Sequence, residues 1–321
     1  MFSNPTAITF TGYMILMVIL GFVAWRYTRN FNDYILGGRS LGGVVTALSV
    51  GASDMSGWLL MGLPGAVFLS GITESWIAIG LTLGTYLNWK FVAARLRVYT
   101  EVSHNALTLP DFFTHRFKDD TRMLRILAAV VILVFFTIYC ASGVVAGARL
   151  FENTFDMSYE RAVWIGAAAT IIYVFIGGFL AVSWTDTFQA SLMCVALVVT
   201  PIVVMTDLGG FSSAVEQVKA IDVNMVNMLS HQTFIGVLSL IAWGLGYFGQ
   251  PHILVRFMAI RHEDELKLSR RIASIWVVIS MAVAVFIGIV GHAVSNVGRI
   301  PMLEGSATET VIVRLSDLLS S

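Results

Sequence analysis

Apolar stretches of about twenty residues recur along the whole chain, and they constrain its fold more than any other feature. A helix of that length crosses the ~30 Å hydrocarbon core of a bilayer. Of the 321 residues, 57% are hydrophobic and only 12% are charged, whereas about a quarter of the residues in a soluble domain are charged. We therefore predict an all-α polytopic membrane protein.

Hydropathy and helix-breaking residues together predict eight membrane spans. The spans cover residues 8–26, 42–63, 73–91, 124–150, 162–182, 187–206, 233–255 and 272–294. Arg and Lys gather in alternate loops, so the positive-inside rule makes that side cytoplasmic and places the N-terminus outside. A tight turn is expected at 183–186. The longest outer loop, at 208–232, is expected to contain a short amphipathic helix.

Several function classes have no support in the sequence. The formal net charge is zero, so the chain has no excess of positive charge that would favour binding to nucleic acid. Cys140 and Cys194 lie in predicted spans without metal-ligand spacing, and the histidines do not cluster as zinc ligands. No nucleophile elbow, phosphate loop or dinucleotide motif is present, so we do not expect an enzyme. No obligate protein partner is indicated.

The second span carries a carboxylate, Asp54, between Gly51 and Gly57. A charge near the bilayer centre costs roughly 3 kcal/mol on insertion scales, so it persists mainly where it faces a cavity, a partner or an ion. The glycines, with Ser53 and Ser56, favour local unwinding. An unwound helix at this depth frees carbonyl oxygens that suit a small cation. The alternative is a kinked packing helix whose aspartate pairs with a basic neighbour.

Aromatic residues mark two further candidate positions. Trp243, Tyr247 and Pro251 are spaced four apart, which predicts one helix face. The indole of Trp243 and the phenol of Tyr247 offer flat walls for a small ligand, although core packing explains these aromatic residues equally well. Tyr139 lies in the middle of the fourth span, where its phenol needs a partner. The glycine pairs at 80 and 84 and at 143 and 147 predict close helix packing.

Two charged residues have simple structural interpretations. Asp186 is expected to cap the sixth span, and Arg39 to anchor the cytoplasmic start of the second.

Six stretches of the sequence resemble the solute:sodium symporter family: 33–41, 51–65, 106–111, 137–143, 177–186 and 243–252. The resemblance implies a five-plus-five inverted-repeat transporter fold with an extra N-terminal helix, working by alternating access in the bacterial cytoplasmic (inner) membrane. The chain would be a single transmembrane domain truncated in the second repeat. Its parts would be the first helix and a cytoplasmic loop (1–40), the first repeat (41–206), an outer loop (207–232) and the start of the second repeat (233–321).

The motifs are most similar to those of members that import proline, so the resemblance implies sodium-coupled symport of L-proline into the cell. Ala52 and Met55 would offer backbone oxygens to sodium, and Asp54 would be required without necessarily touching the ion. Positions in or beside the substrate site match Ser56, Gly57, Trp58, Tyr139, Trp243, Tyr247 and Pro251. Arg39 and Asp186 match positions linked to coupling and cytoplasmic gating.

The resemblance places further sodium ligands beyond Ser321, so the 321-residue chain alone is expected not to transport. Three alternatives stay open. The chain could serve a symporter for another amino acid, pantothenate or a sugar, or a transporter-like sensor module. A channel would need a continuous polar pore, which the scattered polar residues fit less well.

Overall fold

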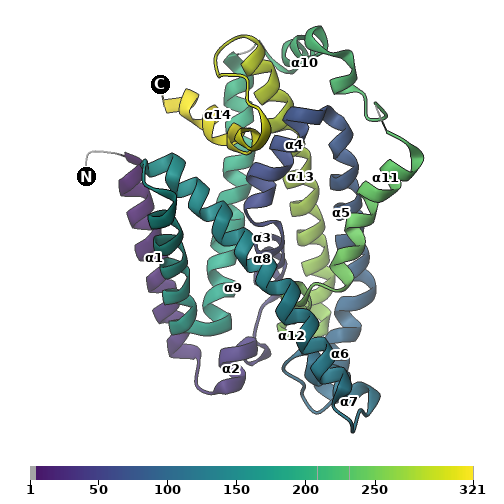
Figure 1. Cartoon of the computed structure of the whole chain (residues 1–321). Coiled ribbons are helices and arrows are strands. Elements are labelled where there is room, and N and C mark those ends of the chain that lie inside the picture. The colour runs from purple at the N-terminus through teal and green to yellow at the C-terminus, as the bar shows by residue number, and fades with distance from the viewer. Residues whose placement is uncertain (1–4, 208, 231, 321) are drawn as a thin grey trace. The chain divides into compact units, whose positions relative to one another are not determined.

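The computed structural model describes residues 5–207, 209–230 and 232–320, and these residues form helices joined by turns and loops (Figure 1). The helices are α1 Pro5–Tyr27, α2 Phe31–Leu36, α3 Gly43–Gly57, α4 Leu63–Ser70, α5 Ser75–Asn88, α6 Ala94–Val102, α7 Leu109–Phe117, α8 Met123–Phe155, α9 Tyr159–Asp207, α10 Phe211–Ile221, α11 Phe234–Ile241, α12 Pro251–Ala259, α13 Leu266–Asn296 and α14 Val311–Ser320. Shorter helical segments with a different winding lie between them. They include the π-helix η2 (Trp58–Gly62) and the 3₁₀ helix η6 (Ala242–Phe248). The predicted all-α class is confirmed.

Long apolar helices cover the predicted membrane spans. Among the described residues, five helical stretches are long and apolar enough to cross a membrane, and the pair from α11 to α12, bent by 43°, makes a sixth. The stretches at 43–102 and 159–206 contain 60 and 48 residues, and one crossing requires about 20. Each is therefore long enough for two crossings, and the eight predicted spans coincide with these stretches to within one residue. The amphipathic helix expected in the outer loop is α10, while residues 208 and 231 of that loop lie outside the described residues.

Gly178 interrupts α9 inside the fifth predicted span, close to the end predicted at residue 182. Its backbone, with φ 58° and ψ −147°, is open to glycine and strained for other residues. A Cβ at this position would also meet the ring and carbonyl oxygen of Tyr34 at 2.7 and 2.8 Å.

The predicted turn at 183–186 is wrong, because these residues lie in the helix that follows Gly178. Ser183 and Thr185 donate hydrogen bonds to carbonyl oxygens of the preceding turn, a pattern that serves a helix interior as well as a turn. The prediction that Asp186 caps a helix fails for the same reason.

The chain forms two compact units. The first comprises the described residues of 1–54, 90–189 and 251–270, and the second those of 55–89, 190–250 and 271–321. In the first unit, α1 packs closely on the first half of α9: a Cβ on Gly21 would lie 3.3 Å from the carbonyl oxygen of Tyr173. At the other end of α1, the ring of Phe10 meets that of Phe151 of α8 edge to face.

Close backbone approach holds the second unit together. The backbone of Gly244 in η6 lies against Gly80 and Gly84 of α5. A Cβ on Gly84 would overlap the carbonyl oxygen of Gly244, and a Cβ on Gly244 would overlap the carbonyl oxygen of Gly80. The amide of Asn88 donates to the carbonyl oxygen of Tyr247 at 2.9 Å and extends the same contact. The close packing predicted from the glycines at 80 and 84 is confirmed.

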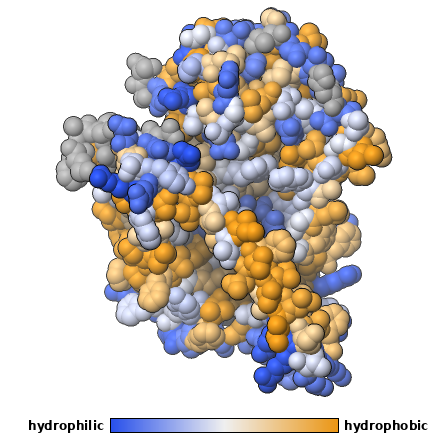
Figure 2. Space-filling view, viewed as in Figure 1, coloured by the Kyte–Doolittle hydropathy of each residue, from blue (hydrophilic) through white to orange (hydrophobic). Residues whose placement is uncertain are grey.

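The outer surface of α8 is apolar. Side chains such as Ile126, Leu133 and Phe135 are more than half exposed, and Figure 2 shows the hydrophobic colour along the strip that α8 occupies in Figure 1. Such a surface indicates contact with lipid rather than water. An ideal Cβ on Gly143 or Gly147 of α8 meets no described atom within 4 Å, so the close packing predicted there is not observed.

Replacement of Gly244 by alanine should destabilise the fold, because the added methyl group overlaps the backbone of α5. Overpacking of this kind costs about 1–3 kcal/mol. Thermal unfolding of the purified protein in detergent measures the effect. Gly147→Ala is the matched control, since it adds the same group in open space. Equal melting temperatures for the two variants would contradict the close approach.

Candidate functional site

The second predicted span is a broken helix. α3 loses helical geometry at Ser56, where φ is 44° and ψ is −156°. The predicted interruption between Gly51 and Gly57 is therefore confirmed, but the non-helical residue is a serine. Such backbone geometry costs a residue with a Cβ about 1–3 kcal/mol, and it concentrates at functional sites. The hydroxyl of Ser56 accepts a hydrogen bond of 3.4 Å from the Trp58 amide just after the break.

In the first unit, Asp54 lies beside a histidine that the sequence analysis did not select. The Asp54 side chain is 9% exposed, and its carboxylate oxygen is 3.8 Å from Nε2 of His252. His252 is the second residue of α12, next to Pro251. Its ring stacks on that of Tyr139, with centroids 5.1 Å apart. The Tyr139 hydroxyl in turn donates to the carbonyl oxygen of Ser53 at 2.7 Å.

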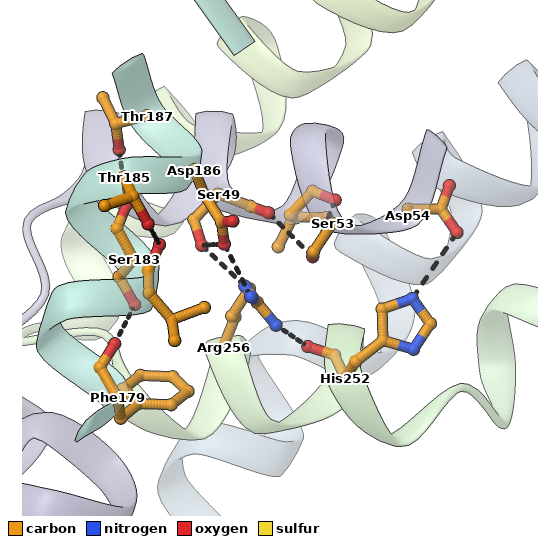
Figure 3. Close-up of polar contacts among 12 residues, drawn as sticks. Ser49, Ser53, Asp54, Phe179, Ser183, Thr185, Asp186, Thr187, His252 and Arg256 are labelled. Carbon is orange, nitrogen blue, oxygen red and sulfur yellow. Dashed lines mark hydrogen bonds and ion pairs between the residues drawn. The ribbon is translucent and has the colours of Figure 1, made fainter. Parts of the chain in front are cut away.

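A buried ion pair lies about one turn away from this cluster, toward the start of α3 and toward the end of α12 (Figure 3). Nη2 of Arg256 donates to Oδ2 of Asp186 at 2.7 Å, and both side chains are at least 90% buried. The Ser49 hydroxyl donates to the same carboxylate oxygen at 2.7 Å. Asp186 therefore does not cap a helix; it links α9 to α3 and α12.

Sequence reasoning missed His252, Arg256 and Ser49. The spacing of the histidines indicates no metal site, and Arg256 lies one residue beyond the end of the seventh predicted span. The available signal is the pair itself: an arginine four residues after a histidine, at the end of an apolar span.

Arg39 lies in a cage of neutral oxygens. Its guanidinium donates to Asn105 Oδ1 at 2.9 Å, to Thr100 Oγ1 at 3.1 Å, and to the carbonyl oxygens of Met258 at 2.6 Å and Ala106 at 3.0 Å. Burial lowers the pKa of Arg39 to about 10, and the positive charge of Arg97 adds to the shift. The group stays protonated at neutral pH, so it places a positive charge at the carbonyl end of α12.

In the second unit, two aromatic residues of the predicted substrate site are in contact. The rings of Trp58 and Trp243 stack with centroids 6.1 Å apart and planes inclined by 23°. Tyr247 is 2% exposed, whereas Trp243 is 54% exposed. The predicted common face for Trp243, Tyr247 and Pro251 is wrong, because η6 is a 3₁₀ helix with three residues per turn and the chain bends before Pro251.

The predicted site residues divide between the two units. Those of the first unit are Arg39, Ala52, Asp54, Tyr139, Asp186 and Pro251; those of the second are Met55, Ser56, Gly57, Trp58, Trp243 and Tyr247. Within the first unit, the structure brings Asp54, Tyr139 and the start of α12 together. Within the second, it brings Trp58 and Trp243 together. That all of them serve one site stays a prediction.

A cavity of about 570 Å³ in the first unit adjoins this cluster. Apolar side chains from α2, α7, α8 and α9 line most of it. α12 contributes Pro251, His252 and Arg256. A volume of this size holds a small organic molecule.

Comparisons with known proteins agree with this architecture. Residues 34–321 match the model of the sodium:solute symporter family. A sodium/proline symporter of Salmonella typhimurium is 61% identical over 99% of this chain and 63% of its own length. The high-affinity proline transporter PutP of Bacillus subtilis is 47% identical over 94% of this chain and 63% of its own. The chain thus spans less than two thirds of these relatives.

A solved structure shares the fold. A substrate-bound, outward-open sodium-coupled sialic acid symporter superposes with a TM-score of 0.84 over 99% of this chain and 66% of its own length, at 18% identity. This likeness shows the five-plus-five transporter fold predicted from the sequence.

Ser56→Gly should raise the melting temperature, because glycine adopts the same backbone without strain. We expect a gain of about 1 kcal/mol, the strain relief less the greater unfolded-state entropy of glycine. Ser56→Ala is the matched control: it removes the hydroxyl but keeps the Cβ and the strain. A glycine variant less stable than the alanine variant would show that the backbone at Ser56 is not strained.

Arg39→Lys should destabilise the protein by about 1–3 kcal/mol, because one ammonium group cannot reach the four oxygens that the guanidinium binds and buried acceptors lose their donor. The measurement is denaturation in detergent. Arg29→Lys, at an exposed arginine of the same loop, is the control and should leave stability unchanged.

Proposed function

Because the chain belongs to the sodium:solute symporter family, we propose that it serves the sodium-coupled import of L-proline by alternating access. The observation that carries the proposal is the high identity, over nearly the whole chain, to a protein named a sodium/proline symporter. The broken helix with a nearly buried carboxylate supports it, since this arrangement suits a small cation.

Sodium is assigned to the broken second span. Backbone oxygens of Ala52 and Met55 would bind the ion, and Asp54 would supply the negative charge that makes its binding favourable, directly or through its neighbours. Support comes from the helix interruption at Ser56 and from the low exposure of Ala52 and Met55, 8% and 2%. Hard oxygen donors are the ligands that small cations prefer.

Proline is assigned to the residues around the two helix breaks. They are Ser56, Gly57, Trp58, Tyr139, Trp243, Tyr247 and Pro251. The stacked indoles of Trp58 and Trp243 offer a flat apolar wall that suits a pyrrolidine ring. The Tyr139 phenol, held on the carbonyl of Ser53, adds a polar group.

The coupling is thermodynamic. Sodium bound at the break would fix the backbone there and reduce the ordering that proline binding requires. By linkage, proline then increases sodium affinity by the same factor. The membrane potential adds about 2.3 kcal/mol per charge per 100 mV to the inward driving force. Arg39 and Asp186 are assigned to coupling and cytoplasmic gating, since each fixes α12 to other helices of the first unit.

We place the protein in the bacterial inner membrane with its N-terminus outside, because the Arg- and Lys-rich loops then face the cytoplasm. The first repeat would comprise 41–206 and the second would begin at 233, within a single transmembrane domain.

Radiolabelled proline uptake into proteoliposomes tests the proposal. A protein that carries this chain within the full length of its relatives should import proline only with an inward sodium gradient, and Asp54→Asn should abolish import because the ion loses its charged partner. Glu160→Gln is the control, since it neutralises an exposed carboxylate in the first turn of α9.

The outcomes separate the alternatives. Proline binding without uptake would favour a sensor module, and the absence of proline binding would favour another solute.

A further inference from the structure

Arg256 has an environment that no assigned role explains. It lies in the middle of α12, one residue beyond the end of the seventh predicted span, and is only 4% exposed. Each of its three nitrogens donates a hydrogen bond: Nε to the hydroxyl of Ser49 at 2.6 Å, Nη1 to the carbonyl oxygen of His252 at 2.5 Å, and Nη2 to Asp186 at 2.7 Å. One side chain therefore joins α3, α9 and the first turn of α12.

This arrangement depends on a guanidinium group. Its planar fork presents donors in fixed directions, so a lysine could keep the charge but not the three simultaneous bonds. The ring of Phe179 lies 5.8 Å from the charged centre and covers it further. A charge this deeply buried persists only when it is paired and hydrogen-bonded, and here Asp186 supplies the opposite charge.

From Arg256 the contacts continue to Asp54, as Figure 3 shows. The guanidinium holds the backbone of His252, and the ring of the same residue faces the Asp54 carboxylate at 3.8 Å. That ring is also fixed by its stack on Tyr139. The two buried carboxylates, Asp186 and Asp54, are thus joined through one arginine and one histidine.

We propose that Arg256 is a positioning residue, and that Asp186 acts on the ion-dependent site around Asp54 through Arg256 rather than by binding the ion itself. Asp186 fixes the guanidinium, the guanidinium fixes the first turn of α12, and that turn places His252 against Asp54. The inference rests on the proposed function only in taking sodium as the ion that binds near Asp54.

A double-mutant cycle tests this coupling. The variants are Asp186→Asn, Arg256→Gln and their combination, in a purified protein that carries this chain within the full length of its relatives. The readout is the sodium concentration that gives half of the maximal thermal stabilisation, with choline chloride holding ionic strength constant. A purely structural role would change the melting temperature without sodium but not this concentration.

We expect each single variant to raise the half-saturating sodium concentration roughly tenfold, and the double variant to raise it no further, as for residues of one network. The double variant leaves no unpaired buried charge, so it remains folded if a single variant does not. Arg256→Lys should lie between the parent and Arg256→Gln. The combined Arg149→Gln and Glu152→Gln variant, which removes an ion pair with side chains 61% and 34% exposed, should match the parent.

Multiplicative effects of the two single variants would overturn the inference, because Asp186 would then act independently of Arg256. If that protein still imports proline, the proposed function stands. Coupled effects in a protein that binds sodium but does not import proline would leave the inference intact and reject proline as the substrate. A parent protein without any sodium response would overturn the inference together with sodium coupling.

Discussion

The first unit depends on one constraint: a charge inside an apolar helix bundle must be paired. Asp186 and Arg256 satisfy it for each other, and the remaining donors of the arginine reach Ser49 and the backbone of α12. Because the partners lie far apart in the sequence, the pair fixes three separate helices at one point. An apolar replacement could fill the same volume, but it would not define how these helices are aligned.

The half-helix α12 shows why such alignment needs charged groups. It has nine residues, and an isolated helix of that length is marginal in stability. Arg39 binds the carbonyl oxygen of Met258 in its last turn, where the helix dipole is negative, and Arg97 binds that of Ile260 directly after the helix. Arg256 fixes its first turn. The segment that begins with Pro251 is thus held at both ends by guanidinium groups, although the chain before it is broken.

Hydropathy predicted the spans well because lipid exposure imposes one requirement on every residue of a span, as α8 shows. The helix break near Asp54 and the close approach at Gly84 were also predicted, since glycine and serine act on their own backbone. Predictions failed where geometry was assumed. An α-helical period was applied to Trp243 and Tyr247, which lie on a 3₁₀ helix. The sequence did not indicate the role of Arg256, because its partners Ser49 and Asp186 are 207 and 70 residues away. No local sequence pattern encodes pairing over such distances.

The break at Ser56 needs an energetic explanation, because glycine follows directly at position 57 and would accept a positive φ without strain. Strained geometry persists when surrounding packing determines it more strongly than the strain opposes it. Met55 before the break and Leu59 after it are 2% and 0% exposed, so both flanks are fixed in the core. Shifting the break by one residue would rotate these side chains out of their places. The packing therefore assigns the strained conformation to Ser56, and it sets the hydroxyl, rather than a bare glycine, at the point where the helix opens.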